Sequence, residues 1–526
     1  MKTLINNIQE QTNTTNAYTA NGAVTNKSTL SPLIDYFGLA GAMREQPGIA
    51  IDLFKAAYAE DPDAAMKILF YLRDIRGGQG ERQHFRNVWD WLMLPHITID
   101  NDELSSARHN ATHIPEFGRW DDLLRLVIHP ALSPAIEVLV REVLHADLYN
   151  SEFYDMETVF DLSEFGHITE KEEPAPNKVS LLAKWMPSLT ANNKDVQQSA
   201  KDWCARLDLT QKQYRKMLKH LRSHLNVVEQ KMCSKNWQDI NYSQVPSQAM
   251  LRLRQAFTKN DPGRYGLYLQ ALEEGKEEVK AGTLYPYQLV EKCDSHISDA
   301  ERKLIAAQWL ALPEYSSKPQ NILTVCDVSG SMKYGTPTPI NVAMSLTLYL
   351  ASRCTNKLWA NKFITFSEDP ELQTINPYDD LYDQVNKLSH ANWGMDTNIE
   401  KTFDLLIHAA NINRTTEMPD SIIIISDMEF NQCAQDDSGR PLTNFENIDR
   451  KFREAGLVRP NLVFWNVNAR SGNTPITVND QGVALVSGFS PSIMQMCFSG
   501  DLSPESCLRE IVLNNPRYQH IKVEYV

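Results

Sequence analysis

Two periodicities divide the chain. From Leu33 to about residue 300, apolar residues recur at three- and four-residue spacing, which is typical of helices that pack on one another. From residue 321 onward, short apolar runs alternate with amphipathic segments, and this alternation is typical of a parallel sheet with helices on both faces. The sequence therefore predicts an all-helical part followed by a doubly wound α/β part.

The α/β part has the clearer element signals. The run NILTVCD at 321–327 is almost entirely apolar, as expected of a central strand that is buried on both faces. Further strands are predicted at 362–366, 421–427, 461–467 and 483–488, and helices at 340–354, 379–388, 444–455, 491–498 and 504–513, with another amphipathic segment beginning at 399.

The helical part carries local start and stop signals. Asp61, Pro62 and Asp63 break one helix and predict the start of the next. LRDIRGGQGER at 72–82 predicts a helix end, a glycine turn and a new helix near Glu81. GGQG is not expected to be a phosphate loop, because no strand precedes it and no GK[ST] follows.

Domain boundaries follow from these patterns. Residues 1–30 are rich in Asn and Thr and poor in large apolar side chains, so we expect a flexible arm. A helical-repeat module is predicted at 31–315, and its paired helices without strands resemble a HEAT-like solenoid. The α/β domain is predicted at 316–526.

Oxygen-bearing side chains follow the first strand of the α/β part. Asp327, Ser329 and Ser331 alternate with Val328 and Gly330, so one carboxylate and two hydroxyls can turn to one side of a tight loop. A hard cation such as Mg2+ prefers such oxygen ligands. A haloacid-dehalogenase-type phosphatase would need Asp at position 329, and Ser stands there instead. A serine-rich turn without a metal remains the alternative.

Two later segments supply further oxygens. NWGMDTN at 392–398 offers Asp396 and Thr397, and the apolar run SIIIISD at 421–427 ends in Asp427. Ligands bind outside the carboxyl ends of strands in open parallel sheets, so we expect the three segments to converge there.

This order of residues resembles the metal-ion-dependent adhesion site (MIDAS) of von Willebrand factor A domains. The resemblance implies that Ser329, Ser331 and Thr397 lie near a divalent ion, Mg2+ or another cation such as Mn2+ or Ca2+. It implies that Asp327 and Asp427 lie close by or act through water, with one position open for a partner's carboxylate. It also implies a Rossmann-like fold for this domain.

Charge is distributed unevenly. The chain has a net charge of −14, yet residues 178–259 hold fifteen basic and five acidic side chains, a local charge of +10. Such segregation is typical of a surface that binds a polyanion. The candidate phosphate-binding residues are Lys184, Arg215, Lys216, Lys219, Arg222, Lys235, Arg252 and Arg254. A solvated face paired with acids elsewhere in the fold is the alternative.

Aromatic side chains accompany these cations. Trp185, Trp203, Tyr214, Trp237 and Tyr242 lie in or beside the basic segment and are candidates for base stacking, although most are expected to be core residues.

Other compositional features narrow the class of protein. Eight cysteines without CxxC spacing indicate a reduced protein without structural zinc. The N-terminus lacks a signal-peptide core, and nowhere do 18 uncharged apolar residues run together, so we expect a cytoplasmic protein that does not enter the membrane.

The helical half carries a second resemblance. The blocks LRDIRGGQGER, IPEFGRWDDLL, KVSLLAKWMPS and YRKMLKHLRSHLNVVEQKM resemble a family whose helical half is similar to the TROVE module of the Ro autoantigen ribonucleoproteins. There too, a von Willebrand A domain follows the helices. The resemblance covers residues 33–526 and implies a helical ring closed by the A domain, with RNA single-stranded ends in the cavity and small structured RNAs outside.

The sequence therefore predicts an RNA-binding, ribonucleoprotein-type scaffold with a divalent-metal site. The alternative is a protein–protein adaptor, without nucleic acid, whose metal captures an exposed Asp or Glu of a partner. An enzyme is not expected, since a nucleophile elbow, Walker A, HExxH and DxDxT are all missing from the sequence.

Overall fold

The computed structural model describes residues 16–94, 101–152, 179–225, 227–293, 297–315, 321–366, 370–389, 398–413, 417–430, 443–490, 493 and 502–523. The chain divides into two compact units. Unit 1 comprises residues 1–88 and 242–520, and unit 2 comprises 89–241 and 521–526. This division differs from the predicted boundaries, because helices from both ends of the helical part associate with the sheet.

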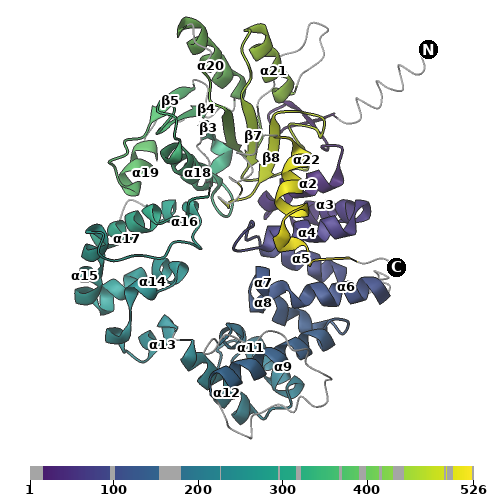
Figure 1. Ribbon diagram of the computed structural model, residues 1–526, viewed down its shortest axis with the longest axis vertical. Coiled ribbons are helices and arrows are strands. Elements are labelled where there is room, and N and C mark those ends of the chain that lie inside the picture. The colour runs from purple at the N-terminus through teal and green to yellow at the C-terminus, as the bar shows by residue number, and fades with distance from the viewer. Residues whose placement is uncertain are drawn as a thin grey trace. The chain divides into compact units, whose positions relative to one another are not determined.

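Unit 1 contains a mixed, mostly parallel sheet (Figure 1). Its strands are β3 (Ile322–Asp327), β4 (Lys362–Phe366), β5 (Glu371–Thr374), β6 (Ser421–Ser426), β7 (Asn461–Asn466) and β8 (Val483–Ser487). Their order is β5-β4-β3-β6-β7-β8, and every neighbouring pair is parallel except β4 with β5. The predicted strands are confirmed within a residue or two, whereas the exposed, polar edge strand β5 was not predicted.

Helices of unit 1 come from three stretches of the chain. The first stretch has α2 (Pro32–Leu39), α3 (Pro47–Glu60) and α4 (Pro62–Arg73); the second has α14 (Ser247–Asn260), α15 (Pro262–Glu273), α16 (Pro286–Val290) and α17 (Asp299–Leu310). The third has α18 (Pro339–Arg353), α19 (Leu381–Ser389), α20 (Ile399–Asn413), α21 (Asn444–Glu454) and α22 (Pro504–Leu508). The predicted helix at 491–498 lies almost entirely outside the described residues.

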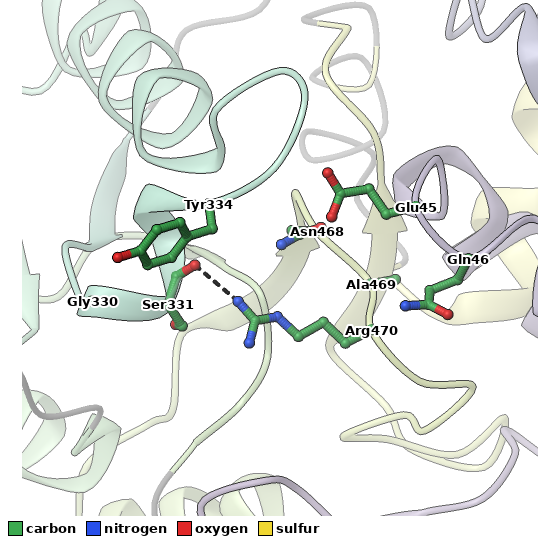
Figure 2. Close-up of a pocket in the computed structure, with 8 residues that line it drawn as sticks. All are labelled: Glu45, Gln46, Gly330, Ser331, Tyr334, Asn468, Ala469 and Arg470. Atoms are coloured by element: carbon green, nitrogen blue, oxygen red, sulfur yellow. Dashed lines mark hydrogen bonds between the residues drawn. The ribbon is translucent and has the colours of Figure 1, made fainter.

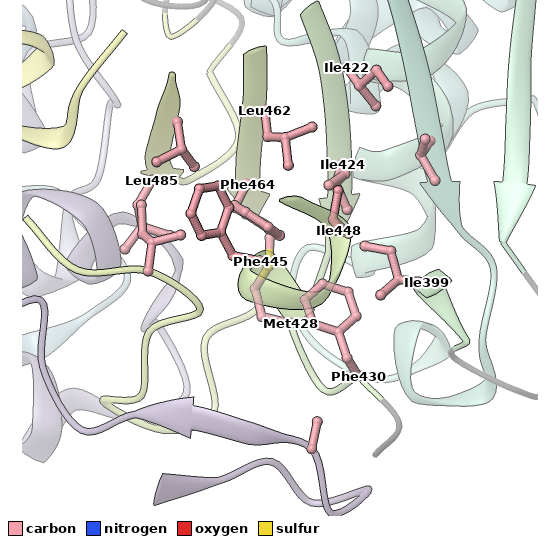
Figure 3. Close-up of a cluster of buried hydrophobic side chains, with 14 of the residues drawn as sticks. Ile399, Ile422, Ile424, Met428, Phe430, Phe445, Ile448, Leu462, Phe464 and Leu485 are labelled. Carbon is pink, nitrogen blue, oxygen red and sulfur yellow. The ribbon is translucent and has the colours of Figure 1, made fainter. Parts of the chain in front are cut away.

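The central strands are apolar throughout because both faces of the sheet are covered. Ile422, Ile424 and Phe464 on one face belong to a core cluster with Phe445 and Ile448 of α21 (Figure 3). Successive strand residues point to opposite faces, and on the other face α18 packs on β3. Full burial of a side chain of this size stabilises the fold by about 1.5–3 kcal/mol.

The strand order creates a topological switch point between β3 and β6. From β3 the chain moves outward to β4 and β5, then crosses back to β6 and continues outward to β7 and β8. Because β3 and β6 are parallel, their carboxyl ends lie side by side, with Cys326 paired to Ile425. Ligands of open α/β sheets bind at this place.

Part of the predicted flexible arm is ordered. Strands β1 (Asn16–Tyr18) and β2 (Val24–Asn26) form an antiparallel hairpin. Thr19 Oγ1 donates to the Phe430 carbonyl at 2.7 Å, and the Ala20 amide donates to Glu429 Oε2 at 2.6 Å. The partners lie about 400 residues away in sequence, so local composition does not reveal them; residues 1–15 lie outside the described part of the chain.

The glycine turn after α4 is a packing device. A Cβ at Gly78 would lie 1.9 Å from the Tyr71 carbonyl oxygen, and one at Gly80, whose φ is +66°, would lie 2.0 Å from the Tyr285 hydroxyl. Both positions therefore require glycine for close approach within unit 1. The start of α4 is as predicted: Asp61 caps it by accepting from the Ala64 amide at 3.0 Å.

Unit 2 is helical in its described residues. It contains α6 (Asn101–Thr112), α7 (Ile114–Phe117), α8 (Trp120–Leu124), α9 (Ser133–Asn150), α10 (Leu182–Trp185), α11 (Lys194–Arg206), α12 (Gln211–His224) and α13 (Val228–Cys233), and α5 (Gln83–Leu92) crosses the boundary between the units along the chain. Among the described helices of either unit, none combines the length and apolar character needed to cross a membrane.

Candidate metal centre and cationic helix

Asp327 ends β3 and is fully buried. Its Oδ1 accepts from the Ser329 amide at 2.9 Å, which turns the chain sharply into a short helical turn at Gly330–Lys333. Its Oδ2 accepts from Ser426 Oγ of the neighbouring strand at 2.6 Å. The carboxylate is thereby fixed at the switch point.

The two predicted hydroxyls lie together. Ser329 Oγ and Ser331 Oγ are 2.9 Å apart. The Ser331 hydroxyl lies beside the Asp427 carboxylate and lowers its pKa by hydrogen bonding. Asp427 directly follows β6, and its Oδ1 accepts from the Glu429 amide at 3.3 Å. The structure thus brings together four of the five predicted ligands, whereas Thr397 lies outside the described residues.

At this edge of the sheet two carboxylates lie close together with little positive charge around them. Burial is the main cause that raises the pKa of Asp327, and the neighbouring Asp427 raises it further. Burial also raises the pKa of Asp427, opposed by the Ser331 hydroxyl and Arg470. Burial and mutual repulsion both disfavour the ionised form of the two carboxyl groups, and a bound cation would stabilise that form.

A cavity of about 520 Å³ opens beside Ser331. Figure 2 shows Tyr334 and Ser331 on one side and Glu45, Gln46 and Arg470 on the other. The Arg470 guanidinium donates to the Ser331 carbonyl at 2.8 Å and lies 3.3 Å from Asp427 Oδ2. Of the described predicted ligands, Ser331 is therefore the one that lines the cavity, whereas Asp327, Ser329 and Asp427 are buried.

The donor set suits a hard divalent cation. It combines two carboxylates with two hydroxyls, and Asp427 Oδ2 is buried without a hydrogen bond among the described atoms. Carboxylate, hydroxyl and water oxygens are the ligands that Mg2+ and Ca2+ take. Ser329, Ser331 and Asp427 could hold such an ion, with Asp327 buried behind them.

The second candidate site is α12 in unit 2. Thr210 caps this helix through a capping box with Gln213, and Tyr214, Met217, Leu218 and Leu221 are buried. Lys212, Arg215, Lys216 and Lys219 are exposed, and the helix contains no acidic residue. Spacings of three and four residues place these cations on one face of the helix.

Arg222 differs from its neighbours on α12. Its guanidinium turns inward and donates to the carbonyls of Ala183 and Met186 at 2.8 and 2.7 Å and to Ser188 Oγ at 2.8 Å. This side chain ties α12 to α10 and to the residues directly after it, so phosphate contact would require these bonds to break.

The remaining predicted cations lie on other elements. In unit 2, Lys184 is exposed with its Nζ 5.9 Å from the Trp185 ring centroid, and Lys235 is exposed after α13. In unit 1, Arg252 is exposed on α14, whereas Arg254 pairs with Glu301 at 2.9 Å and is largely buried. Arg254 is therefore a structural residue, and the basic segment is divided between the two units.

Most of the candidate stacking aromatics are core residues. Trp203, Tyr214 and Tyr242 are buried, and Trp185 and Trp237 are half-buried. The Trp185 ring is also covered by the guanidinium of Arg119, whose central carbon lies 4.5 Å from the ring centroid.

Sequence reasoning did not identify the residues that face Ser331 across the cavity. Asn468 and Arg470 follow β7, the next parallel strand after β6, and Glu45 lies before α3. The position of Arg470 at the carboxyl end of a predicted strand was a usable signal. Nothing in the local sequence of Glu45 indicates its place.

Comparison with known proteins gives two matching domain families. Residues 19–152 and 190–315 match a domain of unknown function (DUF2828), and residues 321–515 match a second domain of unknown function (DUF7788). Among solved structures, the chain is similar to the Deinococcus radiodurans RO (RSR) protein, with a TM-score of 0.39 and 14% sequence identity over 92% of this chain and 100% of that chain.

A relative that matches most of the chain comes from a virus. The uncharacterized protein L728 of Acanthamoeba polyphaga mimivirus is 31% identical over 522 residues, which cover 94% of this chain and 87% of the viral protein. Identity at this level over nearly the whole length indicates common descent, and the chain therefore belongs to the same protein family as the mimivirus protein L728.

Proposed function

We propose that this chain is an RNA-binding, ribonucleoprotein-type scaffold that contacts RNA phosphates through the exposed cationic face of α12. The single observation that carries the proposal is this face: Lys212, Arg215 and Lys219 line one side of a helix without acids. From Lys212 to Lys219, a rise of seven residue steps, the stripe is about 10 Å long. The resemblance of the helical blocks to a TROVE-like, HEAT-like module supports the same function.

The charges of the stripe are available for a polyanion. Arg215 Nε bonds only to the carbonyl of its own helix at Gln211, and no ion pair within the described residues engages Lys212 or Lys219. Cations that are not neutralised by nearby acids attract phosphate and release condensed counterions. Three such contacts on a single strand give a slope of about −2 for log affinity against log salt.

We further propose that the α/β part is a von Willebrand factor A-like domain with a MIDAS-type site. Ser329, Ser331, Thr397 and Asp427, with Asp327 behind them, would hold Mg2+ or another divalent cation. The buried carboxylates and paired hydroxyls support this assignment. A bound ion would supply a Lewis-acidic position for an oxygen ligand. The proposal includes no catalytic step and assumes a cytoplasmic location.

Fluorescence polarisation of a labelled single-stranded RNA of mixed sequence tests the RNA-binding proposal. The full chain is expected to bind at about 50 mM salt and to lose affinity steeply toward about 400 mM, as phosphate contacts require. Absence of binding at the lowest salt would contradict the proposal.

The cavity beside Ser331 favours a second candidate, a metal-dependent adaptor that captures an acidic side chain. Arg470 on the cavity wall and a cation at Asp427 would both attract a carboxylate. Under this alternative, Asp327→Ala abolishes partner binding and neutralisation of α12 has no effect. Under the RNA proposal, neutralisation of α12 is the damaging change.

A further inference from the structure

We propose that Arg470 competes with the divalent cation for Asp427. Its guanidinium lies next to the Asp427 carboxylate, and cation binding displaces the Arg470 side chain into the cavity. This inference rests on the proposed metal site and adds a residue that regulates it. It concerns the loop after β7, which the MIDAS-type motif does not include.

The contacts of Arg470 give it the position of a substitute cation. Its guanidinium donates to the Ser331 carbonyl at 2.8 Å and lies 3.3 Å from Asp427 Oδ2. That oxygen is buried and makes no hydrogen bond within the described part of the chain. Arg470 thus supplies charge but not a well-formed hydrogen bond, which makes the pair easier to break than a bidentate one.

Arg470 supplies a positive charge next to the buried Asp427 carboxylate, with its guanidinium 3.3 Å from Oδ2. A divalent ion bound to Asp427 would take over this role with twice the charge. The guanidinium and the ion would then repel each other at close range.

The cavity beside Ser331 offers space into which the Arg470 side chain can move. Arg470 is 38% exposed, whereas the carboxylate of Asp427 is fully covered. Figure 2 shows Arg470 extended across the cavity wall, with the carboxylate of Glu45 on the same cavity. A long, half-exposed side chain can leave Asp427 by rotating into this space, whereas the carboxylates cannot leave.

Mn2+ titration of the full chain by calorimetry and by thermal unfolding tests the inference. Arg470→Gln is expected to bind Mn2+ on the order of tenfold more tightly than the wild type, because the competing charge is gone. In EDTA the same variant should unfold at a lower temperature than the wild type, so that the stabilisation caused by Mn2+ becomes larger. Arg453→Gln removes an equal charge from an exposed, 76% accessible position on α21 and should leave Mn2+ affinity unchanged.

A merely structural role for Arg470 predicts a different outcome. Unchanged or weaker Mn2+ binding by Arg470→Gln would overturn the inference. If this variant does not fold, arginine modification of the wild type by phenylglyoxal, mapped by mass spectrometry, replaces it: Mn2+ should increase the modification of Arg470, and protection or no change would overturn the inference.

Failure of the metal site itself is distinguishable. If neither the wild type nor any Arg470 variant binds Mn2+, and Asp427→Asn behaves as they do, the proposed metal site is wrong and the inference falls with it. If the wild type binds Mn2+ and Asp427→Asn does not, but Arg470→Gln equals the wild type, only the inference is wrong.

Discussion

Neutralising the cationic face of α12 should abolish most RNA affinity without unfolding the chain. The variant carries Lys212→Gln, Arg215→Gln and Lys219→Gln. All three side chains are exposed, and glutamine has nearly the same helix propensity as lysine and arginine. The buried side of the helix, with Tyr214 and Leu218, stays intact.

The magnitude follows from counterion release. Each phosphate contact on a single strand contributes about 0.7 to the slope of log affinity against log salt. Three contacts therefore contribute about 2 to the slope, and about two log units of affinity at 0.1 M salt relative to 1 M. The variant should bind RNA about a hundredfold more weakly at 0.1 M salt and show little residual salt dependence from this face.

Fluorescence polarisation across a salt series measures both quantities. The matched control carries Lys55→Gln, Lys276→Gln and Lys303→Gln, which change the net charge equally but remove lysines that pair with acids at 2.9, 2.6 and 2.8 Å. The control should bind RNA nearly as the wild type does. If both variants lose affinity equally, general charge and not the α12 face determines binding, and the reasoning fails.

Three further predictions concern stability and the metal site. Gly78→Ala should lower the free energy of unfolding in denaturant by about 3 kcal/mol, because the new methyl group meets the Tyr71 carbonyl. Gly263→Ala, whose methyl group meets nothing within 4 Å, should change the free energy of unfolding by less than about 1 kcal/mol. Equal effects would refute the packing role of the turn. Burial lowers the pKa of His84 from 6.5 to about 4, so the folded protein excludes a proton that the unfolded chain accepts. The contribution of neutral His84 to the free energy of unfolding is therefore complete above pH 6.5, and up to about 3 kcal/mol of it is lost as the pH falls to about 4. His84→Gln should flatten that dependence in unfolding measured from pH 7 to 4, and an unchanged slope would assign it to other groups. Mn2+ should raise the unfolding temperature of the wild type but not of Asp427→Asn, and equal shifts would exclude a site at β6.

Much of the α/β part was predictable because its physical signal is local. A central parallel strand is apolar on both faces, so the run SIIIISD predicts both β6 and the carboxylate of Asp427 that follows it. Parallel pairing then brings Asp327 and Asp427 to the same edge. The edge strand β5 escaped prediction because its residues are mostly exposed and carry no apolar alternation.

Contacts between distant segments were not predictable from local patterns. The hairpin at residues 16–26 reads as a polar arm, yet its backbone is held by partners after β6 such as Glu429 and Phe430. Arg222 and Arg254 look like surface cations in sequence, and only the fold shows that a carbonyl cluster and Glu301 engage them. Charge counting identifies a basic segment but not which of its side chains serve the fold.

Isolation of the protein from its native cells after ultraviolet crosslinking tests the central claim most directly. Sequencing the attached RNA and mapping the crosslinked peptides should give RNA well above a mock isolation, with crosslinks concentrated in α12 and the helices of unit 2 next to it. Absence of RNA above the mock level, or crosslinks confined to the sheet of unit 1, would contradict this account.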